Sequence, residues 1–129
     1  YVRAYPGQHR RKGKGGCGMA LEARELLKNE GISAGVVNMH TIKPIDREAV
    51  VRAAAGTGAI VTAEEHSIIG GLGSAVAEVV CETRPVPVLR VGVNDKFGKS
   101  GKVPALLDMY GLTPANIAAK ARAAVEMKK

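Results

Sequence analysis

Two carboxylates and an imidazole stand together in the middle of the chain, where they could carry out acid–base chemistry. Glu64, Glu65 and His66 follow directly on a short apolar run. A carboxylate beside an imidazole can act as a general base and a general acid. Side chains that are neighbours in sequence point in different directions, however, so these residues could instead fix the geometry of a loop that packs on another chain or domain. A catalytic role and an interface role both stay open.

A glycine-rich segment follows and leads into an apolar pattern of helical spacing. Bare backbone N–H groups at the positive end of a helix suit an anion. The glycine spacing matches neither the dinucleotide fingerprint nor a phosphate loop, so close packing of the helix on a sheet is the competing explanation. The candidates for an interface or a small-anion site are Glu64, Glu65, His66, Gly70, Gly71, Gly73 and Ser74.

The elements that must position these residues alternate between helix and strand. Apolar residues at helical spacing predict helices, and β-branched runs predict strands. The predicted helices cover residues 19–29, 46–55, 71–82, 104–110 and 114–127, and the predicted strands cover 32–39, 59–63 and 88–93. Such alternation is typical of an α/β fold of three layers, with a mostly parallel sheet between helices. We expect the candidate residues in the loop at the carboxyl edge of this sheet, where sites of such folds usually lie.

Composition bounds the class of protein. The 129 residues predict one domain, and with 46% apolar residues, no Trp and one Phe its core must be aliphatic. No run approaches the roughly 18–20 apolar residues that a membrane span needs, and no signal-peptide pattern is present.

Cys17 and Cys81 lack metal spacing and are expected to be free thiols in a reducing cytoplasm, with Cys81 in the core. No group of His, Cys, Asp and Glu has the spacing of a metal site.

The positive charge is concentrated at the start of the chain. The formal net charge is +7, but residues 1–16 hold five basic residues and no acid, which leaves +2 for the rest. Residues 1–18 are also rich in glycine and show no periodicity. We therefore predict an irregular basic arm over 1–18 and a folded domain over 19–129. Such an arm could contact the phosphates of a nucleic acid or remain a solvated tail.

Several segments together resemble the C-terminal domain of transketolase. The segment at 61–76 reads VTAEEHSIIGGLGSAV, and the segments at 38–46, 95–101 and 110–113 read NMHTIKPID, DKFGKSG and YGLT. All four are similar to segments of that family, in the same order. Related domains in deoxyxylulose-phosphate synthase and in the β subunit of 2-oxo acid dehydrogenases are the alternatives, although EEHS and FGKSG resemble transketolase more.

The resemblance implies a part in a transferase. Transketolases use thiamine diphosphate and a divalent metal (Mg or Ca) to move a ketol unit between sugar phosphates in the pentose phosphate pathway. No catalytic, cofactor-binding or metal-binding residue of the family can be carried onto a position of this chain. The resemblance therefore implies a non-catalytic cytoplasmic domain, inactive alone, that docks on an N-terminal half or pyrimidine-binding domain and shares in homodimer contacts.

One segment departs from the family pattern. The family has an apolar first strand before the first helix, whereas residues 9–18 here are basic and rich in glycine. A core strand cannot be this charged, so the first strand is expected to be absent or displaced, or the segment to be altered. The alternative functions are a free-standing anion-binding regulatory module and a nucleic-acid binder that uses the basic arm, the latter being the less expected.

Overall fold

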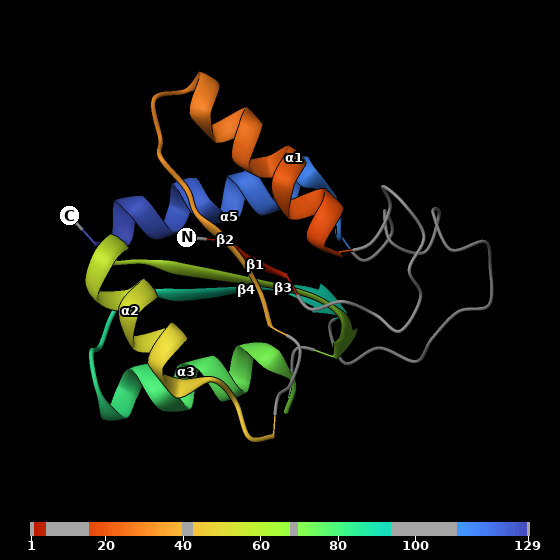
Figure 1. Cartoon of the computed structure of the whole chain (residues 1–129). Coiled ribbons are helices and arrows are strands. Elements are labelled where there is room, and N and C mark those ends of the chain that lie inside the picture. The colour runs from red at the N-terminus through yellow and green to blue at the C-terminus, as the bar shows by residue number, and fades with distance from the viewer. Residues whose placement is uncertain (1, 5–15, 40–42, 68–69, 94–110, 129) are drawn as a thin grey trace.

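The computed structural model describes residues 2–4, 16–39, 43–67, 70–93 and 111–128. The described residues form three layers, in which a parallel sheet lies between two pairs of helices (Figure 1). Helices α1 and α5 cover one face of the sheet and helices α2 and α3 cover the other. This arrangement confirms the predicted α/β fold. No helix in the described part is long and apolar enough to cross a membrane.

The sheet holds four described strands in the order β2-β1-β3-β4, and all of the neighbours are parallel. The strands are β1 (Val2–Ala4), β2 (Val36–Asn38), β3 (Ile60–Ser67) and β4 (Val88–Val93). Because parallel strands must be joined by crossovers, each helix packs back onto a face of the sheet.

Two of the described helices begin where a side chain accepts a hydrogen bond from a free backbone N–H group. The described helices are α1 (Gly16–Asn29), α2 (Arg47–Thr57), α3 (Leu72–Glu82) and α5 (Pro114–Met127). Asp46 Oδ1 accepts from the N–H of Ala49 at 3.1 Å, and Thr113 Oγ1 accepts from the N–H of Asn116 at 3.1 Å. Both N-caps were expected from sequence. The helix predicted over 104–110 lies outside the described residues.

Two aliphatic core layers hold the helices on the sheet. Residues of β3 alternate between them, because successive side chains of a strand face opposite ways. Val61 and Ala63 lie in the layer under α1 and α5, whereas Ile60 lies in the layer under α2 and α3. The largest fully buried aliphatic side chains are those of Leu27, Ile60, Leu72, Leu112, Ile117, Val50, Val61 and Val76.

The structure differs from the expected irregular arm at both ends. Residues 2–4 form a strand in the sheet interior, in register with Val36 on one side and Val61 on the other, and α1 begins at Gly16 rather than at residue 19. The first strand is thus present but lies upstream of the basic segment. A strand of this length can stay in the sheet because β2 and β3 on its two sides supply hydrogen-bond partners for its backbone. Residues 5–15 lie outside the described part, and an irregular arm there stays a prediction.

Two further expectations were wrong. Strand β3 does not end at Ala63 but runs through Glu64, Glu65 and His66 to Ser67, because it keeps pairing with β4 beyond an irregularity in the register. Polar side chains suggested a loop, but backbone pairing does not depend on side-chain polarity. Cys81 was expected in the core and is an exposed free thiol. It directly follows buried residues of α3, so the helical turn carries it to the outer side.

Candidate functional site

The carboxylate of Glu64 is buried and bonded to the beginning of α3. Its side chain is 1% exposed. Oε2 accepts a hydrogen bond from the N–H of Leu72 at 2.6 Å, and Oε1 accepts a longer one from the N–H of Gly73 at 3.4 Å. Glu64 extends from β3, so the bonds join the carboxyl part of that strand to the helix that follows it in the chain.

The physical reason for this contact is the free N–H groups of a helix start. The first N–H groups of a helix have no partner within the helix, and the helix dipole favours negative charge there. A buried carboxylate is costly unless it is hydrogen-bonded. The carboxylate and the N–H groups therefore satisfy each other. The glycine segment suggested a bound anion at this helix start, and the carboxylate of Glu64 supplies that negative charge from within the chain.

Gly73 lets α3 approach the sheet closely. An added Cβ at this position would lie 2.6 Å from Cδ of Arg90 and 2.9 Å from Oγ1 of Thr62. Thr62 and Arg90 are paired across β3 and β4. Only a hydrogen fits between the helix backbone and these two side chains, which is the close packing that sequence analysis gave as the competing explanation for the glycines.

The remaining candidates shape the turn before α3. Gly70 has φ of +72°, a conformation that favours glycine, and its N–H donates to the hydroxyl of Ser74 at 3.0 Å. Gly71 is the extended residue directly before the helix. The structure therefore brings together Glu64, Gly73 and the turn, whereas for Glu65 and His66 it describes the backbone in β3 and not the side chains.

Sequence reasoning missed Thr62 and Arg90. Thr62 is fully buried, and its Oγ1 has no hydrogen-bond partner within the described part of the structure. A threonine in a β-branched run carries no signal of this kind, and Arg90 meets it only through strand pairing. No group of three or more His, Cys, Asp and Glu in the described residues could hold a metal ion.

The surroundings of α3 also decide whether a diphosphate fits there. The N–H groups of Leu72 and Gly73, which a phosphate would use, already bond the carboxylate of Glu64. That buried negative charge would repel a phosphate. The described residues at this junction therefore do not fit the diphosphate of a thiamine cofactor.

Comparison with known proteins decides the family. Residues 15–117 match the family model described as "Transketolase, C-terminal domain". The chain belongs to the transketolase C-terminal domain family. The match extends over all four segments that carried the resemblance and leaves out residues 1–14 and 118–129. The confirmed α/β fold agrees with it.

Curated members of this family are longer than the chain. The chain is 52% identical over 109 residues to a 6-deoxy-6-sulfo-D-fructose transketolase subunit of Clostridium sp. (strain MSTE9), covering 84% of this chain and 34% of that protein. It is 51% identical over 111 residues to a putative transketolase C-terminal section of Methanocaldococcus jannaschii, covering 85% and 34%. The chain thus spans about a third of the length of these relatives.

Two further matches show the breadth of the family. A 1-deoxy-D-xylulose-5-phosphate synthase of Heliobacterium modesticaldum is 45% identical over 106 residues, covering 81% of this chain and 16% of that protein. A solved split gene transketolase, described as an inactive beta4 tetramer, is 50% identical with a TM-score of 0.87, covering 99% of this chain and 40% of that chain. The chain therefore shares its fold with a split gene transketolase and is similar in sequence to part of a longer synthase.

Proposed function

We propose that this chain is the non-catalytic C-terminal section of a thiamine-diphosphate-dependent transketolase, and that it serves domain packing and dimerisation. The observation that carries the proposal is the bonding of Glu64. This carboxylate, the first of the acid–base candidates, is buried and bonded to the start of α3. A group committed in this way stabilises the fold, which supports the proposal that the chemistry of the enzyme comes from another domain.

The carboxyl part of β3 is the proposed docking edge. Glu65 and His66 continue the strand past Glu64 toward the turn before α3, and carboxyl edges of parallel sheets are the usual place for contacts with ligands and neighbouring domains. We propose that these two residues contact the half of the enzyme that holds the pyrimidine-binding domain. Gly70 and Ser74 shape the same edge.

The cofactors of the complete enzyme belong to the partner half in this proposal. Thiamine diphosphate supplies the carbanion chemistry of ketol transfer when bound with its divalent metal (Mg or Ca). The chain contributes a rigid surface that holds the partner half in its active dimer. A reducing cytoplasmic setting agrees with the free thiol of Cys81, and sugar phosphates of the pentose phosphate pathway are the proposed substrates.

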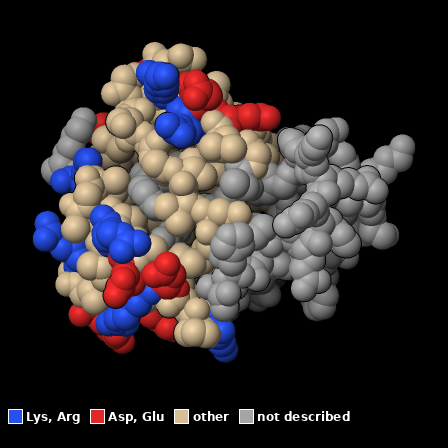
Figure 2. Space-filling view, viewed as in Figure 1, with Lys and Arg blue, Asp and Glu red and all other residues tan. Residues whose placement is uncertain are grey.

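The described surface gives little support to the alternative of a nucleic-acid binder. On the face shown in Figure 2, Lys and Arg lie in mixed clusters with Asp and Glu. Among the described residues, ion pairs join Arg47 to Glu82, Arg52 to Glu48 and Arg122 to Glu30. Phosphate-binding proteins usually present a stripe of one sign, and the described part of this face presents none. The basic residues at 10–14, on which this alternative rested, lie outside the described part.

Reconstitution tests the proposal. The chain is mixed with the N-terminal half of the same enzyme, thiamine diphosphate and Mg²⁺, and ketol transfer is measured with each half alone as a control. We expect transfer in the mixture well above that of the N-terminal half, and none from this chain alone. Equal rates with and without the chain would refute the proposal, and so would transfer by the chain alone.

Paired variants locate the docking edge. Glu65→Ala and His66→Ala are expected to weaken the association with the N-terminal half in sedimentation experiments. Glu78→Ala is the matched control, because Glu78 is an exposed residue of α3 away from the helix start. Association that is unchanged by the first two variants would place the docking surface elsewhere.

A further inference from the structure

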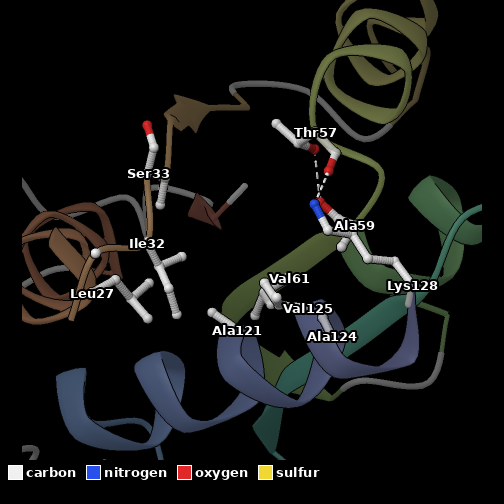
Figure 3. A pocket seen from close by; sticks show the side chains of 12 residues that line it. Leu27, Ile32, Ser33, Thr57, Ala59, Val61, Ala121, Ala124, Val125 and Lys128 are labelled. Carbon is white, nitrogen blue, oxygen red and sulfur yellow. Dashed lines mark hydrogen bonds between the residues drawn. The ribbon is translucent and has the colours of Figure 1, made fainter.

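A largely apolar pocket lies at the amino edge of the sheet, the edge where the parallel strands begin. Its volume is about 320 Å³, and pockets that bind small molecules begin at about 300 Å³. Figure 3 shows Ile32 and Ser33 on one side and Thr57 and Ala59 on the other, with α5 along the base. The apolar side chains that line it include those of Leu27, Ile32, Ala34, Val61, Ala121 and Val125.

The fold holds a positive charge at the rim of this pocket. Among the described residues that line it, Lys128, directly after α5, is the one with a charged side chain. Its ammonium donates to the carbonyl oxygen of Thr57, the last residue of α2, at 2.9 Å. Its stem passes Gly58, where an added Cβ would lie 3.4 Å from Cδ of Lys128. An ammonium has further N–H donors besides the one used here, so this cation is placed to bind a ligand as well.

The helix ends around the pocket are capped from within the chain. Helices carry partial negative charge at their carboxyl ends, and α1, α2 and α5 all end at this edge. After α1, the N–H of Ile32 donates to the carbonyl oxygen of Leu27 at 2.9 Å. After α2, the N–H of Gly58 donates to the carbonyl oxygen of Ala54 at 3.0 Å. A ligand with a cationic group would in addition meet Lys128 as a like charge, whereas an anionic group would meet an opposite charge.

We propose that this pocket binds a small monocarboxylate with an aliphatic chain. The aliphatic chain of the ligand lies on the apolar lining, where each methylene group is removed from water. The carboxylate lies at the rim and accepts a hydrogen bond from the ammonium of Lys128, and hydrogen bonds between two ionised groups are about twice as strong as neutral ones. The site lies at the opposite edge of the sheet from the proposed docking edge, so the ligand and the partner half would bind at different places.

Titration of the full chain with three simple probes tests the proposal. Octanoate has the chain and the negative charge, octylamine has a similar chain with a positive charge, and acetate has the charge without the chain. Amide chemical shifts are followed by nuclear magnetic resonance. We expect octanoate to shift the signals of pocket residues such as Ile32 and Ala59 and to bind at least about tenfold more tightly than either other probe. Absence of saturable octanoate binding, or an affinity for octylamine or acetate equal to that for octanoate, would overturn the proposal.

A pair of lysine variants tests the role of the charge. Lys128→Met keeps a long unbranched stem and removes the ammonium, so octanoate should bind about fivefold more weakly. Lys120→Met is the matched control, because Lys120 is an exposed residue of α5 that does not line the pocket. That variant should keep the affinity within about twofold. An affinity that is unchanged by Lys128→Met, or lowered equally by both variants, would count against the proposed carboxylate contact.

Filling the pocket from its wall tests where the ligand lies. Val125→Phe, or Ala34→Leu if the first variant does not fold, places extra apolar volume in the same space. The affinity for octanoate should fall by about tenfold or more, because the aliphatic chain of the ligand would clash with the new side chain. Unchanged affinity would show that octanoate binds elsewhere and would also overturn the proposal. Because these measurements use this chain alone, they are independent of whether it supports ketol transfer.

Discussion

Glu64 shows how one residue can resemble a catalytic group and serve the fold. Its carboxylate is buried and accepts from the N–H groups of Leu72 and Gly73. Thr62, on the same face of β3, presents the opposite case, since its buried hydroxyl has no partner within the described part of the chain. The two residues should therefore respond to the loss of a polar group in opposite directions.

Glu64→Gln is expected to lower the free energy of unfolding by about 1.5–3 kcal/mol. The amide removes the negative charge that the start of α3 favours, and it can present an N–H₂ group where an acceptor is needed. Urea unfolding followed by circular dichroism measures the change. Glu78→Gln, an exposed change on the same helix, should stay within about 0.5 kcal/mol, and a loss equal to that of Glu64→Gln would contradict the capping role.

Thr62→Val is expected to raise the free energy of unfolding by about 1 kcal/mol. Valine keeps the branched shape and removes the buried oxygen that has no partner. Thr57→Val is the control, because the hydroxyl of Thr57 lies 2.7 Å from the carbonyl oxygen of Ala53 and 2.9 Å from that of Ala59. That variant should lose about 1 kcal/mol in the same urea experiment. Destabilisation by Thr62→Val would show that its hydroxyl has a role in the fold.

At the scale of elements, α3 packs closely on β3 and β4 because Gly73 has no side chain. Gly73 lies in the first turn of α3, with Thr62 and Arg90 directly below it. The apolar residues Leu72, Val76, Val79 and Val80 then bury the rest of this helix face. The position of α3 in turn sets the turn at Gly70 and the carboxyl edge that we propose as the docking surface.

Gly73→Ala is expected to lower the free energy of unfolding by about 1–3 kcal/mol. The added methyl group would lie 2.6 Å from Cδ of Arg90, so the side chain or the helix must move. Gly56→Ala in α2 is the matched control, since an added Cβ there meets nothing within 4 Å. That change should raise the stability by about 0.5–1 kcal/mol. Thermal unfolding of the two variants gives the comparison, and equal effects would rule out close packing at Gly73.

At the scale of the whole molecule, the sheet separates two core layers, and both layers are formed by residues of the same chain. Ile117 of α5 lies in one layer, and Ile60 of β3 lies in the other. At the surface, Arg122 of α5 donates to both carboxylate oxygens of Glu30, the residue directly after α1, at 2.9 and 3.0 Å. Exposed pairs of this kind contribute at most about 1 kcal/mol, so the two layers carry most of the stability.

Ile117→Val and Ile60→Val test whether the layers unfold as one unit. Each variant should lower the free energy of unfolding by about 0.5–1.5 kcal/mol, because one buried methylene group is lost. The double variant should show the sum within about 0.5 kcal/mol, since the residues lie on opposite faces of the sheet. Urea unfolding followed by circular dichroism should show one transition in all three. Two separate transitions would mean that the layers fold independently.

Much of the fold could be predicted because its signals are local. The helices α2, α3 and α5 were predicted within a few residues, since periodicity and caps such as Asp46 and Thr113 act within one or two turns. Strand β1 could not be predicted, because three residues beside a basic segment carry no periodic signal. The end of β3 at Ser67 was also missed, because the residue that pairs with Ser67 is Val93, which is distant in sequence.

The sequence by itself determined the α/β alternation, the ends of α2, α3 and α5 within a few residues, and the transketolase C-terminal family, all of which depend on patterns of neighbouring residues. Only the tertiary structure decided the role of Glu64 and the neighbours of Gly73. Each of these depends on which strands pair and in which register, and register is set by contacts between residues far apart in the chain. A carboxylate that could have been a catalytic group is a helix cap because α3 folds back over β3.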